Sequence, residues 1–573
     1  MMALWRVQMA GSQSSPILNE AGSASGPSQA SASEASPSPK PAGPAAPGDH
    51  RLPRDQIARC GRNYPTHPAY VAGEVSRSWG EMDSRSDRIA AALQALGTRK
   101  GDAVGMLSGE FIEVYEHFFA CLKIGAIRVG INRRLAVHEL VHVIRDAGLT
   151  SLAVHVDCMP LLEKLRDAGG VEGLHLIGFG GKHDLTFDLE TMIAQADEQP
   201  DFPDIEPEHP AFYSYTSGTT GLPKGVVLTH HGLAVSFPHA VSQFGFTRAD
   251  IFYHATSNAW VAIVLGMLGL ANGMTTVLPE GGLFELPKLL PELAKHRTTI
   301  ALLAPTMLGW AVDEHRKGEH DLSALRMIAF GSSPSTPALI RDAHDVFGCE
   351  LLNCYAMTET TWGGVSFLMP EDIRRGLADK PELLNSVGMI APLFDIAVRD
   401  EEGRDLPRGE AGELWLRSEA NMLRYLNLPD ETGEVLVDGW MRTNDIGRVD
   451  DDGYLYLLDR RKFMIISGGI NVYPIVVEAA LAEHGAIAES CVVGIPHPVW
   501  GEAVVAVVRL RDGESADADS LRDFCRERLN HVQVPKHFHF ITEALPRTVT
   551  GKMQKAQVRQ SLAGQPELFP WNN

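Results

Sequence analysis

The stretch 215–232 reads YTSGTTGLPKGVVLTHHG and concentrates groups that can bind phosphate. Glycines allow the backbone to approach a ligand closely, so that successive N–H groups converge on phosphate oxygens. Hydroxyl and ammonium donors to a charged acceptor contribute roughly 1.5–3 kcal/mol per hydrogen bond. The stretch therefore predicts a polyphosphate-binding loop, whose donors are Thr216, Ser217, Gly218, Thr219, Thr220, Gly221 and Lys224.

The flanks of this loop argue against an ordinary polar surface loop. Apolar runs at 211–215 and 225–228 predict two strands that the loop joins. The Walker pattern, GxxxxGK followed by Ser or Thr, is absent, and Pro223 stands directly before Lys224. Because a proline restricts the residue before it to extended geometry, we do not expect the loop to run into a helix. The sequence predicts a phosphate-binding hairpin.

Two further stretches supply groups suited to the rest of a nucleotide. In 353–359, NCYAMTE, Tyr355 can present a ring face to adenine, and Thr358 and Glu359 offer oxygen ligands for Mg²⁺. In 441–447, MRTNDIG, Asp445 can accept hydrogen bonds from both ribose hydroxyls. Taken alone, Tyr355 could equally be a core residue, and Asp445 could equally be a turn residue.

The motif YTSGTTGLPKG resembles the phosphate loop of the adenylate-forming superfamily, which contains acyl-CoA synthetases, nonribosomal peptide adenylation domains and luciferases. Other motifs of that family recur in its order over roughly residues 50 to 560. The resemblance implies that the loop binds the phosphates of ATP. It places adenine and ribose on Gly331, Asn353, Cys354, Tyr355, Asp445 and Arg460. It also implies that Lys552, Glu359 and Thr358 are catalytic, with Glu359 as the Mg²⁺ ligand.

The resemblance also indicates where a carboxylic acid would bind. The implied lining is Asn258, Trp260, Ser332, Ser333, Gly363 and Gly364. Asn258 occupies a position where many relatives carry His or an aromatic residue. It could instead cap a buried helix that is predicted to begin at Ala259. We expect an aromatic or alicyclic acid rather than a long-chain acid.

The stretch 459–462, DRRK, resembles the family's interdomain linker, in which Lys462 would be the hinge. Two positions depart from the family pattern. Asp459 stands where Gly is usual, and Phe463 stands where Asp is usual. Near the C-terminus, PRTVTGK places Lys552 on a predicted turn. A surface lysine is usually a solvated charge, but this one coincides with the family's catalytic lysine.

The apolar patterns and the resemblance together predict an α/β protein with a large N-terminal adenylate-forming domain of layered sheets and helices and a small, mobile C-terminal α/β lid domain. Helical spacing occurs at 87–96, 113–124 and 519–529. Strands are predicted at 103–107, 299–305, 327–330, 454–458, 489–495 and 503–510. We predict four parts: a disordered Ser/Pro/Ala-rich tail at 1–48, an ATP- and carboxylate-binding domain at 49–458, a hinge at 459–462 and a lid domain at 463–573.

The stretch 138–142 reads HELVH and matches the zinc-protease pattern HExxH, with Glu163 as a conceivable third ligand. With 22 histidines in the chain, a chance match is expected in roughly one such sequence in twenty. The resemblance places an ordinary surface helix here. We therefore expect a scaffold helix and keep zinc binding as the alternative.

Composition restricts the partners of the 573-residue chain. Its net charge of −21 disfavours nucleic acid and anionic membrane, because phosphate contacts need clustered Lys and Arg. The seven cysteines form no CxxC pair, which indicates a reducing, cytoplasmic setting without structural zinc. The longest apolar run, 259–271, is shorter than the roughly twenty residues of a membrane-spanning helix. We expect neither nucleic acid nor membrane insertion, and a homodimer is left open.

These features predict activation of a carboxylic acid to acyl-AMP with release of pyrophosphate, followed by transfer to coenzyme A. ATP, Mg²⁺ and coenzyme A are the expected cofactors. One alternative passes the acyl group to a carrier protein or an amine; the other is a nucleotide-binding protein without catalysis. A chain without an appended carrier domain favours coenzyme A. The joint presence of Lys552, Glu359 and Asp445 argues against a protein without catalysis.

Overall fold

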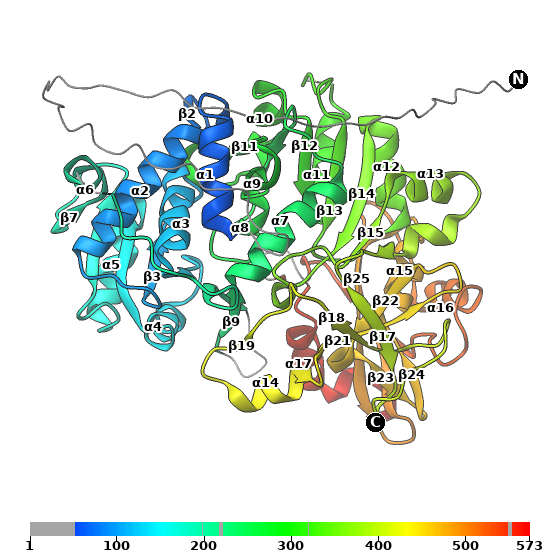
Figure 1. Cartoon of the computed structure of the whole chain (residues 1–573). Coiled ribbons are helices and arrows are strands. Elements are labelled where there is room, and N and C mark those ends of the chain that lie inside the picture. The colour runs from blue at the N-terminus through cyan, green and yellow to red at the C-terminus, as the bar shows by residue number, and fades with distance from the viewer. Residues whose placement is uncertain (1–51, 197–198, 217–221, 319, 548–552, 573) are drawn as a thin grey trace, which may run out of the picture. The chain divides into compact units, whose positions relative to one another are not determined.

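A computed structural model describes residues 52–196, 199–216, 222–318, 320–547 and 553–572. All of them belong to the unit His50–Asn573. The tail predicted at 1–48 lies outside the described residues. Figure 1 labels the helices and strands of the unit.

One sheet of the large domain carries the predicted hairpin. Its eight strands run in the order β19-β9-β8-β4-β3-β5-β6-β7. The strands from β8 to β7 are parallel, whereas β8 and β9 form an antiparallel hairpin and β19 pairs antiparallel with β9. The predicted hairpin is therefore confirmed. The bounds are β3 (Ala103–Leu107), β4 (Ile127–Gly130), β5 (Leu149–His155), β6 (His175–Phe179), β7 (Phe187–Asp188), β8 (Pro210–Thr216), β9 (Lys224–Thr229) and β19 (Arg424–Tyr425).

A second sheet of nine strands runs in the order β16-β15-β14-β13-β12-β10-β11-β1-β2. From β14 to β1 all pairs are parallel, as expected for short, largely apolar and mostly buried strands. The carboxyl ends of β13 and β14 lie in register, with Gly331 opposite Cys354, so the loops after them leave from the same edge. The bounds are β1 (Pro68–Ala72), β2 (Val75–Ser78), β10 (Ile251–Tyr253), β11 (Thr275–Leu278), β12 (Ile300–Leu303), β13 (Met327–Gly331), β14 (Glu350–Tyr355), β15 (Ser366–Leu368) and β16 (Met389–Ile390).

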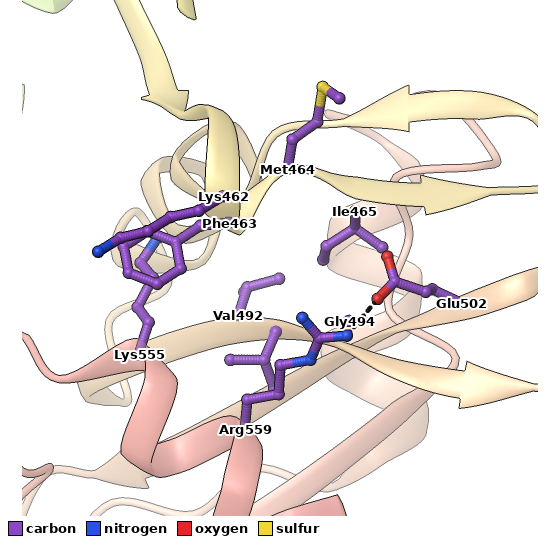
Figure 2. A pocket seen from close by; sticks show the side chains of 10 residues that line it. Lys462, Phe463, Met464, Ile465, Val492, Gly494, Glu502, Lys555 and Arg559 are labelled. Carbon is purple, nitrogen blue, oxygen red and sulfur yellow. Dashed lines mark hydrogen bonds and ion pairs between the residues drawn. The ribbon is translucent and has the colours of Figure 1, made fainter. Parts of the chain in front are cut away.

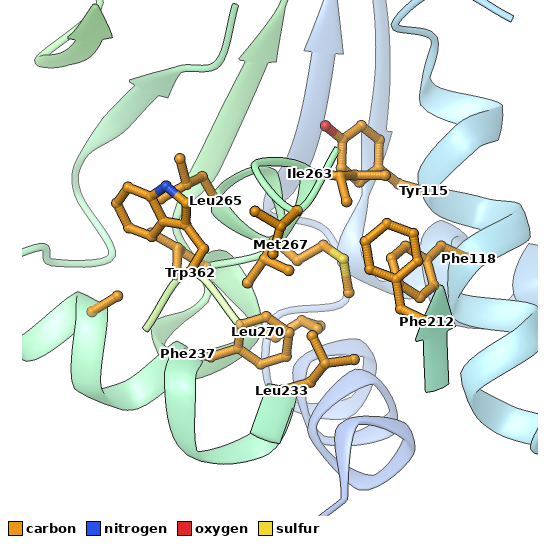
Figure 3. Close-up of a cluster of buried hydrophobic side chains, with 14 of the residues drawn as sticks. Tyr115, Phe118, Phe212, Leu233, Phe237, Ile263, Leu265, Met267, Leu270 and Trp362 are labelled. Atoms are coloured by element: carbon orange, nitrogen blue, oxygen red, sulfur yellow. The ribbon is translucent and has the colours of Figure 1, made fainter. Parts of the chain in front are cut away.

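The core of the large domain is built around α3 (Ile112–Ile124), which is buried on all sides. Figure 3 shows Tyr115 and Phe118 of this helix near Phe212 of β8, with Met267 beside them. Besides α8 and α9, which are described below, this domain contains α1 (Pro53–Asn63), α2 (Trp79–Ala95), α4 (Val137–Asp146), α5 (Met159–Asp167), α6 (Leu189–Gln195), α7 (His230–Phe244), α10 (Leu289–Lys295), α11 (Pro305–His315), α12 (Pro337–Phe347), α13 (Pro370–Ala378) and α14 (Pro429–Val435).

The single buried helix predicted from Ala259 is wrong. The segment folds instead into two short helices, α8 (Ile263–Gly266) and α9 (Gly269–Asn272). A Cβ at Gly266 would lie 2.4 Å from the Tyr115 hydroxyl, and one at Gly269 would lie 2.6 Å from the ring of Trp79. These glycines let the backbone press against the aromatic core, and glycine also disfavours a continuous helix.

Two smaller sheets complete the unit. The first comprises β17 (Asp395–Arg399), β18 (Gly412–Arg417), β21 (Trp440–Val449) and β20 (Leu436–Val437), with β22 (Leu455–Arg460) paired to β21. The second belongs to the C-terminal domain and comprises β24 (Ile470–Val472), β23 (Ile465–Ser467), β26 (Gly501–Leu510) and β25 (Ile487–His497), with β27 (His537–Ile541) paired to β26.

The C-terminal sheet carries α15 (Pro474–Ala482), α16 (Ala518–Arg526) and α17 (Lys555–Ala563), coloured orange to red in Figure 1. The predicted α/β fold class, with a large N-terminal and a small C-terminal domain, is confirmed. Among the helices of the described ranges, none combines the length and apolar composition that crossing a membrane requires.

Candidate active site

Three side chains from separate sequence motifs meet here: Tyr355 and Arg460 are the last residues of β14 and β22, and Asp445 lies within β21. The Tyr355 hydroxyl donates to Asp445 Oδ2 at 2.5 Å, and Arg460 Nε lies 2.6 Å from Asp445 Oδ1. The antiparallel pairing of β21 with β22 sets Asp445 opposite Arg460. The structure therefore brings together three of the six residues that the resemblance assigned to adenine and ribose.

The electrostatics of this cluster keep its donors protonated. Burial raises the pKa of Tyr355 well above its ordinary value, and the neighbouring Asp445 carboxylate adds to this. The same carboxylate raises the pKa of Arg460. Asp445 is largely buried, and its backbone N–H donates to Thr443 Oγ1 at 3.0 Å. A carboxylate held in this way keeps lone pairs that can accept from a diol.

The expected Mg²⁺ ligand lies beside this cluster. Glu359 belongs to the 3₁₀ turn Thr358–Thr360, and its Oε1 accepts a hydrogen bond from the Tyr425 hydroxyl at 3.0 Å. Its backbone carbonyl accepts from Met422 N at 2.7 Å. The carboxylate is thus held through one oxygen, and it suits a hard cation that takes most of its ligands from water and phosphate.

Tyr425 is a site residue that the sequence analysis missed. It lies in β19, opposite Val226 of the hairpin, and Lys224 Nζ is 5.9 Å from its ring centroid. Lys224 Nζ also lies 3.6 Å from Glu431 Oε1. Burial and the Glu359 carboxylate raise the pKa of Tyr425, so its hydroxyl stays a donor. A two-residue strand offers no periodicity, so no local sequence signal indicated Tyr425.

The phosphate loop is described at its two ends only. Thr216 and Lys224 are paired across the hairpin. Ser217, Gly218, Thr219, Thr220 and Gly221 lie outside the described residues, as does Lys552. The roles assigned to these six residues remain predictions from the sequence.

The turns after β13 and β14 hold unusual backbone conformations. Ser332 has a φ of 70°, and Thr361 and Trp362 have φ values of 53° and 51°. Non-glycine residues in this region are strained and cluster at functional sites. A Cβ at Gly331 would lie 2.4 Å from the Cys354 carbonyl oxygen, so this position requires glycine.

The segment predicted to line the acyl group contacts aromatic side chains. A Cβ at Gly363 would lie 3.1 Å from the ring of Phe394. Gly364, with a φ of 72°, offers its carbonyl to His239 Nε2 at 3.2 Å. The ring centroids of His239 and Phe394 lie 6.2 Å apart. Ser333 follows the turn residue Ser332, and Asn353 and Cys354 are buried in β14.

Asn258 is not a helix cap, because α8 begins at Ile263 with Ala262 at its N-cap. Its side chain is anchored in the core instead. Arg128 Nη2 donates to Asn258 Oδ1 at 3.1 Å, and Asn258 Nδ2 donates to the Gly109 carbonyl at 2.8 Å. Trp260, two residues on, is half-buried.

A buried polar cluster surrounds Asn258. Arg128 is fully buried, and its guanidinium lies 5.6 Å and 5.7 Å from the ring centroids of Phe118 and Phe212. Glu110 accepts a hydrogen bond from the Asn258 backbone N–H. Burial raises the pKa of Glu110 to about 8 and lowers that of Arg128 to about 10. Asn258 thus links two buried ionisable groups.

The HExxH stretch forms α4 and contacts the phosphate hairpin. His142 Nε2 lies 3.0 Å from the Pro223 carbonyl, whereas His138 is exposed and Glu163 pairs with Arg166. Among the described residues, no three His, Cys, Asp or Glu side chains gather as a metal site. His142 therefore braces the end of the phosphate loop.

Comparison with known proteins identifies the family. The profile of the AMP-binding enzyme family matches residues 57–426, and that of the AMP-binding enzyme C-terminal domain matches residues 476–552. The chain is 34% identical over 513 residues to the fatty acid–[acyl-carrier-protein] ligase ScoC of Streptomyces coeruleorubidus, covering 87% of this chain and 94% of that protein.

A feruloyl-CoA synthase of Amycolatopsis sp is 32% identical over 512 residues, covering 88% of this chain and 97% of that protein. Among solved structures, the amide bond synthetase McbA of Marinactinospora thermotolerans superposes with a TM-score of 0.80 at 29% identity, covering 89% of this chain and 99% of that chain. The names of these three relatives refer to an acyl carrier protein, to CoA and to an amide bond, respectively. The chain belongs to the AMP-binding enzymes of the adenylate-forming superfamily.

Proposed function

We propose that this protein is an AMP-forming ligase that activates a carboxylic acid with ATP and transfers the acyl group to coenzyme A. The observation that carries the proposal is the convergence of Tyr355, Asp445 and Arg460 with Glu359, which is linked through Tyr425 to Lys224 of the phosphate loop. This set matches the parts of a nucleotide in order: base, ribose, metal and phosphate. The family membership supports ATP use.

In the first step an oxygen of the substrate carboxylate attacks the α-phosphorus of ATP. The bond from that phosphorus to the β-phosphate oxygen breaks, and pyrophosphate leaves with its electron pair. Positive charge near the phosphorus stabilises the transition state, and Lys552 together with Lys224 supplies it from this chain. Asp445 and Arg460 hold the ribose so that the α-phosphate is oriented for attack.

The residues present fit a magnesium ion. Glu359 offers one carboxylate with a fixed geometry, and Mg²⁺ usually takes one or two protein carboxylates and completes its shell with phosphates and water. When bound, the ion neutralises phosphate charge. Thr358, directly before Glu359, adds a hydroxyl next to the same position.

In the second step a nucleophile attacks the acyl carbon, and AMP leaves with the carboxylate oxygen. Coenzyme A is the proposed nucleophile, supported by the likeness to a feruloyl-CoA synthase over nearly the whole chain. The likeness to a fatty acid–[acyl-carrier-protein] ligase supports a carrier protein as the second candidate. An amine remains the third, on the likeness to an amide bond synthetase.

The aromatic surroundings of Gly363 and Gly364 support an aromatic or alicyclic acid. Phe394 contacts the position of Gly363, and Trp362 stacks against Phe244 with ring centroids 6.0 Å apart. Flat rings of this kind bind a planar ring better than a long flexible chain, because fewer rotors are immobilised.

We also propose the domain boundaries 49–458, 459–462 and 463–573. A cytoplasmic location is supported by the seven cysteines, all of them buried and free.

A panel of carboxylic acids with ATP and Mg²⁺, analysed by mass spectrometry with and without coenzyme A, tests the proposal. We expect acyl-AMP without coenzyme A and the acyl-CoA thioester with it. Asp445→Asn should lower the yield of both through weaker ATP binding. Formation of acyl-AMP that coenzyme A does not consume, but a phosphopantetheinylated carrier protein or an amine does, would replace coenzyme A by that acceptor. No acyl-AMP with any acid would refute ligase activity.

A further inference from the structure

The two positions at which the linker departs from the family pattern, Asp459 and Phe463, converge on one lysine. Lys555 Nζ lies 3.1 Å from Asp459 Oδ2 and 6.0 Å from the ring centroid of Phe463. Figure 2 shows Lys462, Phe463 and Lys555 at one side of a small pocket. The departures from the family are therefore parts of one contact.

This contact joins the linker to two elements of the C-terminal domain. Lys555 is the first residue of α17, and its Nζ also lies 3.0 Å from Glu478 Oε2 of α15. Glu478 in turn accepts from Val492 N of β25 at 2.8 Å, so its carboxylate is fixed by the C-terminal sheet. Asp459, however, belongs to β22, which is paired with β21 of the large domain.

The ion cluster is sheltered from solvent. The side chains of Asp459, Lys555 and Glu478 are 5%, 11% and 18% exposed. Loss of one partner from a buried pair leaves an uncompensated buried charge, which costs far more than loss of one partner from a surface ion pair. Burial alone would lower the pKa of Lys555, but the two carboxylates outweigh this and raise it.

Asp459 also reaches the nucleotide site. Its Oδ1 accepts from the Arg460 backbone N–H at 2.6 Å, and the Arg460 side chain pairs with Asp445 at 2.6 Å. A continuous path of polar contacts thus runs from α17 through Asp459 and Arg460 to the expected ribose-binding carboxylate. The backbone of Arg460 and the ammonium of Lys555 thus contact the two oxygens of the same Asp459 carboxylate.

We propose that Asp459, Lys555 and Glu478 form a latch across the expected pivot at Lys462, which holds Arg460 against Asp445 and has to open before the C-terminal domain can rotate. The proposal rests on the proposed two-step function. Asp459 and Lys555 are positioning residues in it, because they act through Arg460. The latched state keeps the ribose site assembled and favours adenylation, and opening the latch favours transfer of the acyl group.

Asp459→Asn tests the latch, because it removes the charge with little change of shape and leaves the Lys555–Glu478 pair intact. The matched control is Glu502→Gln. Glu502 lines the same pocket and pairs at 2.6 Å with Arg559, one turn after Lys555 on α17. Its other carboxylate oxygen accepts from Ile466 N, which also follows the pivot. Both variants therefore lose one carboxylate charge facing α17, and Asp459→Asn alone changes a contact that crosses the pivot.

Two readouts are compared in wild type and both variants: hydrogen exchange of residues 455–463, and the separate rates of pyrophosphate exchange and of acyl transfer from supplied acyl-AMP to coenzyme A. For Asp459→Asn we expect faster exchange in this segment and a ratio of adenylation to transfer about tenfold lower, as for a weakened buried ion pair. Glu502→Gln should leave the ratio within about twofold of wild type.

Equal changes of both half-reactions in Asp459→Asn, or a ratio like that of Glu502→Gln, would overturn the latch. A wild-type protein that catalyses neither half-reaction would overturn the proposed function instead, and hydrogen exchange would still decide the latch. If the wild-type protein is inactive in this way, an unchanged rate of hydrogen exchange of residues 455–463 in Asp459→Asn would overturn the latch.

Discussion

Replacing Asn258 by alanine perturbs the most tightly bonded side chain of the implied acyl-binding segment. The change removes the acceptor of Arg128 Nη2 and both donors to the carbonyls of Ser108 and Gly109. A hydrogen bond to a charged group contributes roughly 1.5–3 kcal/mol, and a neutral one contributes about 1 kcal/mol. Because the partners are buried and lose these hydrogen bonds, we expect Asn258→Ala to lower the free energy of unfolding by about 3–5 kcal/mol.

Urea unfolding followed by tryptophan fluorescence measures this loss. Asn272→Ala is the matched control, since Asn272 is half-buried and makes two neutral hydrogen bonds, to Phe246 and Met274. It should lose only about 1–2 kcal/mol. The structural reasoning is refuted if the free energy of unfolding of Asn258→Ala lies within about 1 kcal/mol of the wild-type value, the size of one neutral hydrogen bond, while the relative kcat/KM among acids changes. Asn258 would then contact the acid.

Tyr425→Phe should raise the Mg²⁺ concentration needed for half-maximal pyrophosphate exchange by about 5- to 10-fold, because it removes the hydrogen bond that positions the Glu359 carboxylate. Tyr253→Phe removes a similar hydrogen bond, to Glu292, remote from the site, and it should not change this concentration. Equal shifts in both variants would contradict the assignment of Glu359 to Mg²⁺. The raised pKa of Glu110, about 8 against an ordinary 4.5, means that the folded state binds this proton more tightly. A contribution to the free energy of unfolding on the order of 5 kcal/mol is therefore fully present below pH 4.5 and lost as the pH rises through 8. Glu110→Gln should flatten the dependence of Tm on pH over that range, and an unchanged slope would refute the shift. Lys462→Pro fixes φ at the expected hinge, so adenylation should survive while acyl transfer falls on the order of 100-fold; near wild-type rates for both would place the pivot elsewhere.

Local sequence patterns predicted the elements of this protein well. The hairpin β8–β9 and the buried strands β3 and β13 follow from short apolar runs bounded by turn residues, and the helix α3 follows from apolar residues at helical spacing. The same patterns failed from Ala259 onward, where apolar residues suggested one long helix. Gly266 and Gly269 break it there because the aromatic core comes too close for side chains.

Contacts between distant parts of the chain were out of reach of sequence patterns. Asn258 is bonded to Arg128, 130 positions earlier, and Asp459 to Lys555, 96 positions later. Tyr425 meets Glu359 only because a two-residue strand pairs with the phosphate hairpin. Such contacts depend on tertiary packing rather than on periodicity, so residues with unremarkable neighbours could not be recognised.

The fate of the carboxylate oxygen tests the central claim most directly. An accepted acid labelled with ¹⁸O in both carboxylate oxygens is incubated with ATP, Mg²⁺ and coenzyme A, and the products are separated for mass spectrometry. If the carboxylate attacks the α-phosphorus, each AMP formed carries a single ¹⁸O atom and the pyrophosphate carries none. Label in inorganic phosphate with ADP as the nucleotide product, or unlabelled AMP, would contradict the formation of an acyl adenylate at this site.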